Sequence, residues 1–351
     1  MRHIDWKIGV EIELLAPLGS SREALARQVA ARVGGSATRI FHPESETSAV
    51  PGHPVFENLT LGHRVADAQG AWIASFVDDL TLQADLDKSH APRQGWYRIV
   101  ADDARLLRLA QQHCDAKAPL EDVLAPLAAL FGTQTQTHDG GMVRVVDALG
   151  ASVAIGAPLP GERERPCEIV TAPIESGHAE IIGALLADAR ALGFTLPHEG
   201  ATHIHFDAAP MRDPRALARL VAFYEAHHAA LRAFAQSNPA CVRLGGWPPE
   251  LARLVADPAF ATLDWPDAAR RLAQVGLKKW CDINLANLVN ETPGKDTIEF
   301  RIFPATLDAA EVLRWARGCA AILHFCRDPD APDIPADEAE LVETIPELSR
   351  R

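Results

Sequence analysis

The stretch Gly9-Val10-Glu11-Ile12-Glu13-Leu14 alternates acidic and apolar residues, and it constrains the fold more than any other segment. Side chains at positions i and i+2 of a strand point to the same face. A strand here puts Glu11 and Glu13 together and the aliphatic residues on the opposite face. Two adjacent carboxylates repel unless a cation lies between them, and their oxygens suit Mg²⁺ or Mn²⁺. The alternative is an edge strand with a solvated acidic face.

A second alternating stretch is Ala201-Thr202-His203-Ile204-His205-Phe206-Asp207. A strand here places His203, His205 and Asp207 on one face. A single histidine on a strand usually packs or faces solvent, but two histidines with an acid form a more specific pattern. Imidazole is a common metal ligand and can also hydrogen-bond to phosphate.

The third alternating stretch runs from Thr297 to Phe303 and places Glu299 and Arg301 on one face. The functional interpretation has Glu299 on a metal ion and Arg301 on a phosphate group. The alternative is a salt bridge on an exposed face, which contributes little to stability.

A fourth predicted strand, Cys167 to Pro173, holds one acid, Glu168, among apolar neighbours. Burying a lone carboxylate is costly without a partner, which makes Glu168 a candidate ligand. Arg163 and Arg165 in the preceding loop could hold an anion, although the pattern favours a solvated charged loop. Asp79 follows another predicted strand, where an acid is commonly a turn former.

The segment Lys278 to Leu288 contains a lysine pair followed by Asn284 between apolar residues. This pattern is a modest signal for binding a polar or anionic group, with Lys278 and Asn284 as the candidates.

Charged groups on one strand face and aliphatic groups on the other predict a sheet that helices cover on one side. The polar side would then be concave and lined with metal ligands. Carboxylates, histidines and an arginine together are the components of a site that clamps a nucleoside triphosphate through divalent ions.

Composition excludes several function classes for this chain of 351 residues. Its net charge of -13 disfavours nucleic-acid binding, which rests on Lys and Arg contacts to phosphates. No segment reaches the ~18 uninterrupted apolar residues of a membrane span. The six cysteines form no C-x-x-C pair, and we expect reduced thiols in a cytoplasmic protein.

The region of about residues 84–160 is mostly helical in pattern, with apolar residues at helical spacing in 103–114 and 119–131. A strand at 142–146, a turn at 147–150 and a partner strand at 152–155 predict a hairpin after these helices. We identify no catalytic constellation there, and the region could shape a substrate pocket or an oligomer contact. Residues 328–351 are acidic and contain prolines, which predicts a flexible or loosely docked tail.

Taken together, these motifs resemble the amidoligase family of carboxylate-amine ligases, related to glutamine synthetase and glutamate-cysteine ligase. The resemblance rests on the four stretches above and on Trp72 with Asp79-Leu80-Thr81-Leu82, in this order along residues 9–303. It implies an α+β fold around a curved, mainly antiparallel sheet, like the glutamine synthetase catalytic domain. Residues 1–327 would form one catalytic domain with a family-variable insertion at about 84–160, followed by the tail 328–351.

The resemblance also implies roles for individual residues. Arg301 would contact the transferred phosphate and, with Glu299, carry the catalysis; His205, Asn284 and Lys278 would approach ATP or substrate. The implied ligands of Mg²⁺ or Mn²⁺ are Glu11, Glu13, Glu168, His203 and Glu299.

The implied reaction is ATP-dependent formation of an amide from a carboxylate and an amine through an acyl phosphate. Small molecules or peptides would supply both groups, and a homo-oligomer is compatible with the sequence. One alternative is a zinc-dependent amidohydrolase using His203-x-His205, although no strand-helix repeat precedes this motif. Another is a non-catalytic nucleotide-binding protein on the same fold.

Overall fold

The computed structural model describes residues 4–49, 55–91, 93–290 and 295–349. The chain forms two compact units, and their division falls within β1 (Ile8–Leu15) and α5 (His178–Ala191). The first unit comprises Met1–Ile12, Pro173–Leu186 and Gly200–Arg351, and the second comprises Glu13–Ala172 and Ala187–Glu199. Both contain helices and an antiparallel sheet, so the α+β class and the antiparallel pairing expected from the sequence are confirmed.

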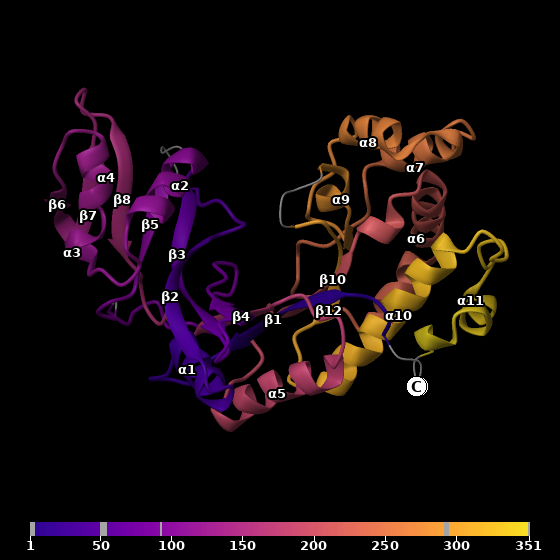
Figure 1. The fold of residues 1–351 in the computed structure, drawn as a ribbon, viewed down its shortest axis with the longest axis horizontal. Helices are drawn as coiled ribbons and strands as arrows, with labels where there is room; N and C mark the ends of the chain where they lie inside the picture. The colour runs from indigo at the N-terminus through magenta and orange to yellow at the C-terminus, as the bar shows by residue number, and fades with distance from the viewer. Residues whose placement is uncertain (1–3, 50–54, 92, 291–294, 350–351) are drawn as a thin grey trace. The chain divides into compact units, whose positions relative to one another are not determined.

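The sheet of the first unit has the strand order β11 (Ile283–Asn284), β12 (Thr297–Pro304), β10 (Ala201–Asp207) and β1. Its helices include two long ones, α6 (Pro214–Ala235) and α10 (Ala309–Arg327), which contact β12 and β10 respectively. Shorter helices complete the unit: α7 (Pro249–Val255), α8 (Trp265–Ala273), α9 (Ala286–Asn290), α11 (Glu338–Thr344) and the 3-10 turns η2 (Ala209–Met211), η3 (Phe260–Thr262) and η4 (Pro346–Leu348). Figure 1 shows α6 and α10 lying along each other within this unit.

The alternation in β10 and β12 separates the two faces of this sheet as predicted. Ile204, Phe206, Ile298 and Phe300 are all buried, and the rings of Phe206 and Phe300 meet edge to face. Burying these side chains against helices leaves the opposite face for the histidine and carboxylate side chains.

The sheet of the second unit has the strand order β9 (Pro166–Thr171), β4 (Trp72–Val77), β3 (Glu57–Ala66), β5 (Tyr97–Ala101), β8 (Ser152–Pro158), β7 (Met142–Val146) and β6 (Gln136–His138). In addition, β2 (Ser36–Pro43) pairs with β3. The helices are α1 (Arg22–Arg32), α2 (Ala104–His113), α3 (Leu120–Val123), α4 (Ala125–Leu130) and the turn η1 (Asp139–Gly141).

Two helices were expected in residues 103–131, and the structure divides the second of them. α2 begins after Asp103, whose carboxylate accepts a hydrogen bond from the backbone N–H of Arg105. Residues 119–131 form α3 and α4, because Pro126 has no N–H to continue a single hydrogen-bonded helix. Leu107 and Leu127 from these helices pack with Leu59 and Ile99 in the core of this unit.

The C-terminal segment differs from the predicted loose tail. Asp337 caps α11, and Leu341, Ile345 and Leu348 are buried. Apolar residues at intervals of three and four give this acidic segment one apolar face, which is buried. The overall acidic composition of the segment does not reveal this periodicity. The proposed division into domain and tail otherwise remains a prediction. Within the described residues, no helix is long and apolar enough to cross a membrane.

Candidate functional site

Strand register brings the predicted residues of the first unit together. On the antiparallel pair β1 and β10, Glu11 lies opposite His203. On β10 and β12, His205 lies opposite Glu299, and on β11 Asn284 lies opposite the same glutamate. Directly opposite residues of a sheet project to the same face, so five residues from distant parts of the sequence meet there.

A β-bulge interrupts the pairing of β10 with β12. Thr202 pairs with Phe303, but Ile204 pairs with Phe300, so Arg301 and Ile302 together lie opposite His203. Bulges bend a strand and redirect its side chains. Here the bulge follows Phe300 and includes Arg301, whose Nη1 donates to the Glu299 carboxylate.

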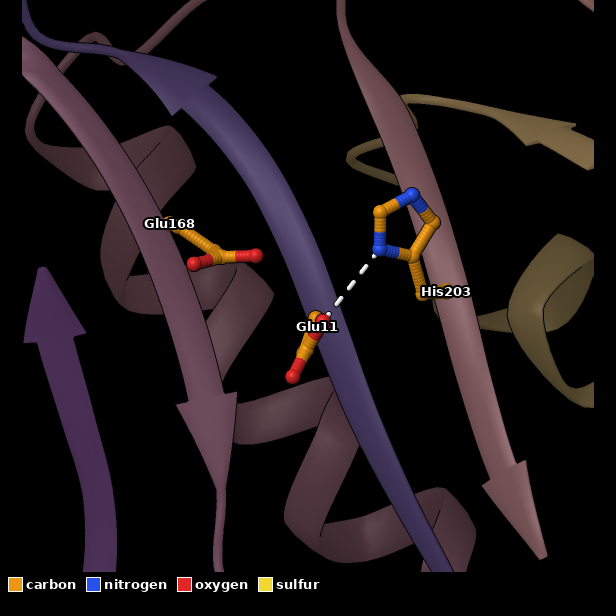
Figure 2. Close-up of side chains that lie close together, drawn as sticks. All are labelled: Glu11, Glu168 and His203. Atoms are coloured by element: carbon orange, nitrogen blue, oxygen red, sulfur yellow. Dashed lines mark hydrogen bonds and ion pairs between the residues drawn. The ribbon is translucent and has the colours of Figure 1, made fainter. Parts of the chain in front are cut away.

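Both histidines lie within ion-pair distance of both carboxylates. His203 Nδ1 is 3.2 Å from Glu11 Oε2 and 3.5 Å from Glu299 Oε1. His205 Nε2 is 3.3 Å from Glu11 Oε1 and 3.9 Å from Glu299 Oε1. Figure 2 shows the pair formed by Glu11 of β1 and His203 of β10, which are neighbouring strands.

Glu299 is held in place by groups on both sides. Asn284 Nδ2 donates a hydrogen bond of 2.7 Å to Glu299 Oε2, while Arg301 donates to Oε1. The Asn284 Oδ1 atom in turn accepts a hydrogen bond of 2.9 Å from the backbone N–H of Ala286, at the start of α9. Asn284 therefore connects a helix end to the carboxylate and restrains its orientation.

The charges in the cluster shift the pKa values of its members. Burial alone would raise the pKa of Glu11, but the positive charge of His205 and the hydrogen bond from His203 hold it well below the usual value. Burial likewise opposes ionisation of Glu299, yet His205 and Arg301 lower its pKa. Burial would lower the pKa of His205, and the two carboxylates raise it instead. Two ionised carboxylates are thus favoured in a half-buried site.

The donor atoms fit a divalent cation. One ligand atom from each of Glu11, His205 and Glu299 lies within 4.8 Å of the other two. His205 Nε2 is buried, and among the described residues it has no hydrogen-bond partner of suitable geometry. Oxygen and imidazole donors suit Mg²⁺, Mn²⁺ or Zn²⁺, and a preponderance of carboxylate favours the first two.

The remaining predicted ligands belong to the second unit. Glu13 lies on β1 beyond the division and is buried, and Glu168 lies on β9 opposite Val77 of β4. Their convergence with Glu11 remains a prediction. Lys278 has an exposed side chain, and its role also remains a prediction.

The loop containing Arg163 and Arg165 is not the solvated loop that its composition favoured. Both side chains are buried, and Arg163 donates to both carboxylate oxygens of Asp78, at 3.1 and 2.7 Å. Arg165 donates to Glu162 and to the backbone carbonyl of Ala16. Paired arginines and acids neutralise each other, which allows a highly charged loop to be buried. Asp79 acts as the expected turn former, with Oδ1 accepting from the N–H of Thr81.

Two contributors escaped the sequence reasoning. Thr297 Oγ1 lies 3.1 Å from His205 Nδ1 and orients the ring. Asp282 is buried and accepts two hydrogen bonds of 2.7 Å from Arg232 and one of 2.9 Å from Tyr224. Its backbone carbonyl accepts from the N–H of Arg301. The sequence signal for Asp282 was its position two residues before Asn284, on the same predicted strand face. Its partners could not be predicted from this signal, because Arg232 and Tyr224 lie about 50 residues away on α6.

Comparison with known proteins agrees with this geometry. A family model described as "Putative amidoligase enzyme" matches residues 5–323, which include every strand of the site. No curated protein gave a match to the chain. Since the match covers most of the sequence and contains the cluster around Glu299, the chain belongs to the amidoligase family.

Proposed function

We propose that this protein is an ATP-dependent carboxylate-amine ligase that forms an amide bond through an acyl phosphate. The observation that carries the proposal is the juxtaposition of Arg301 with the group Glu11, His205 and Glu299 on one sheet face. A cation-binding group next to a permanently charged guanidinium is the arrangement that phosphoryl transfer requires. Membership of the amidoligase family supports a ligase reaction.

In this proposal Glu11, His203, His205 and Glu299 hold the divalent ions. Mg²⁺ or Mn²⁺, held by these residues, would supply positive charge that offsets the charge of the ATP phosphates. Asn284 keeps the Glu299 carboxylate oriented by the 2.7 Å hydrogen bond. Lys278 is an additional candidate for contact with the nucleotide or the substrate.

The reaction would proceed in two steps. A carboxylate oxygen of the substrate attacks the γ-phosphorus of ATP, the bond to the β-γ bridging oxygen breaks, and ADP leaves. The amine then attacks the acyl carbon, phosphate departs with one original carboxylate oxygen, and the amine loses a proton. Arg301 would donate hydrogen bonds to the phosphoryl oxygens while charge moves through the transfer.

The test combines turnover with an isotope label. The purified full chain is incubated with ATP, Mg²⁺ or Mn²⁺, and panels of amino acids and short peptides as acid and amine. We expect phosphate release that requires both partners, and transfer of one ¹⁸O atom from a labelled carboxylate to phosphate. Glu299→Gln serves as the control that keeps the side-chain shape but removes the charge.

Two outcomes would contradict the proposal. Phosphate release without any ¹⁸O transfer would exclude the acyl phosphate. One tightly held zinc per chain, with amide hydrolysis and no ATP-dependent activity, would favour the amidohydrolase alternative.

A further inference from the structure

A second group of charged residues lies in the second unit, on the sheet face opposite its hydrophobic core. Along β5, Tyr97 and Ile99 are buried in that core, and Arg98 between them points to the other face. Arg22 and Arg163 also carry guanidinium groups into this unit. Their hydrogen bonds distinguish structural arginines from one that could hold a ligand.

Arg22 and Arg163 are held by the protein through most of their donors; among the described residues Arg22 Nη2 has no hydrogen-bond partner but lies in an ion pair with Asp78. Arg22 donates to the carbonyls of Leu61, Arg163 and Pro166 at 2.8–3.1 Å, and its Nη2 lies 3.6 Å from Asp78. Arg163 donates from two nitrogens to Asp78 and from two to backbone carbonyls. Both therefore hold the fold together.

Arg98 has a different set of contacts. Among the described residues its one hydrogen bond runs from Nη1 to Asn58 Oδ1, at 3.1 Å. The Asn58 amide is itself oriented, because Nδ2 donates to Ser48 Oγ at 3.1 Å and to the carbonyls of Glu46 and Phe56. Because this hydrogen bond uses Nη1, the donors Nε and Nη2 of Arg98 remain. These two donors form one edge of the guanidinium plane. A carboxylate accepts two parallel hydrogen bonds from such an edge.

The acids near Arg98 do not neutralise it at neutral pH. Asp78 is already paired with Arg163 and Arg22. Burial has the largest effect on the pKa of Glu44 and, with the negative charge of Asp78, raises it to about 8. The hydrogen bond from Thr60 and the positive charge of Arg163 lower this pKa but only partly offset the rise. Thr60 Oγ1 lies 2.6 Å from Glu44 Oε1 and fixes this carboxyl group. A half-buried positive charge is thus left with one amide partner.

We propose that Arg98, oriented by Asn58 and bordered by Glu44 and Thr60, is a binding site for a substrate carboxylate. A singly charged, planar carboxylate matches the edge formed by Nε and Nη2, which make no hydrogen bond among the described residues. A phosphate dianion would need more positive charge than one arginine beside Asp78 and Glu44 offers. Arg98 falls in the expected insertion at residues 84–160, outside the motifs of the resemblance. The assignment to a substrate rests on the proposed ligase function, whereas carboxylate binding itself does not.

Calorimetric titration tests the site without turnover. Acetate and glutarate are titrated at pH 7 into the full chain without ATP or divalent metal, with inorganic phosphate as a separate arm. We expect carboxylate binding at millimolar concentration, and a loss of about tenfold or more in Arg98→Ala, the scale for hydrogen bonds to a charged group. Arg108→Ala, an exposed arginine on α2, is the matched control and should bind like the parent.

Three further variants make the result decisive. Arg98→Lys keeps the charge but loses the fork, so it should recover part of the affinity; it replaces Arg98→Ala if the latter melts early. Arg301→Ala should bind carboxylate like the parent, which separates this site from the one on β12. Binding to the parent should weaken above about pH 8 as Glu44 ionises beside Arg98, Asp78, Asp79 and Arg163, and Glu44→Gln should abolish that dependence.

The proposal is overturned if folded Arg98→Ala or Arg98→Lys binds carboxylate as tightly as the parent. It is equally overturned if Arg301→Ala alone abolishes binding, if phosphate binds and carboxylates do not, or if the parent binds none of the probes. None of these results bears on whether the chain forms amides from ATP.

Discussion

Removing the Asn284 side chain is the perturbation that best separates stability from cation binding. Asn284 is 3% exposed and makes two hydrogen bonds, one to the Glu299 carboxylate and one from the N–H of Ala286. Asn284→Ala leaves Glu299 Oε2 and the N–H of Ala286 in place without these two hydrogen bonds. The backbone pairing of β11 with β12 does not depend on the amide group.

The size of the effect follows from these two bonds. A hydrogen bond to a charged group contributes about 1.5–3 kcal/mol, and the loss of a helix cap typically costs about 1 kcal/mol. The free energy of unfolding should therefore fall by roughly 2.5–4 kcal/mol. Divalent cation affinity should fall by about 10–100-fold, because Asn284 orients a ligand and outer partners of ligands have effects of this size.

The assay pairs thermal and denaturant unfolding with titration of Mn²⁺, followed by electron paramagnetic resonance of the free ion. Asn238→Ala is a matched control, because Asn238 also bonds a carbonyl, at 3.2 Å, and a backbone N–H, at 3.0 Å, with Gly200 and Ala240 as partners. This control should lose about 1–3 kcal/mol, since both of its hydrogen bonds are to neutral groups, and keep the parent Mn²⁺ affinity. If Asn284→Ala loses stability but binds Mn²⁺ like the parent, Asn284 is only a structural cap and the reasoning is refuted.

Three further predictions concern other parts of the chain. Arg301→Ala should remain folded but lose roughly 1.5–3 kcal/mol with its hydrogen bond to the Glu299 carboxylate, and it should lower ATP-dependent phosphate release by roughly 10²-fold, with partial recovery in Arg301→Lys; normal turnover in Arg301→Ala would remove it from the mechanism. Asp282→Ala should lower the free energy of unfolding by about 3 kcal/mol in urea, since it removes the acceptor of Arg232 and of the Gly245 N–H and, among the described residues, leaves Tyr224 only the Gly245 carbonyl at 3.3 Å; an unchanged midpoint would contradict this. The pKa of Glu44 in the folded protein is about 8, against an ordinary 4.5, so protonation of Glu44 stabilises the folded state fully below about pH 4.5, and this stabilisation is lost as pH rises through about 8. Melting temperatures of the parent should therefore decline relative to Glu44→Gln between these pH values. Parallel curves would show that Glu44 titrates normally.

The sequence by itself determined the two faces of the site strands. Alternation with period two is a local property, so it revealed that Glu299 and Arg301 share one face and that Ile298 and Phe300 share the other. The same local logic identified His203 and His205 as candidates before any strand pairing was known. The hairpin of β7 and β8 was also foreseeable, since a turn at Asp147–Gly150 separates two apolar runs.

Only the tertiary structure decided which residues meet across strands. The register that sets Glu11 opposite His203 joins positions 192 residues apart, and the bulge opposite His203 depends on the packing of β12 against its neighbours. The burial of Arg163 and Arg165 is of the same kind. The composition of the loop that contains these arginines predicts a solvated loop. The loop is stable when buried because Asp78, directly after β4, pairs with Arg163. Pairing partners distant in sequence leave no local pattern, because the energy that selects them arises when the sheet and its covering helices assemble.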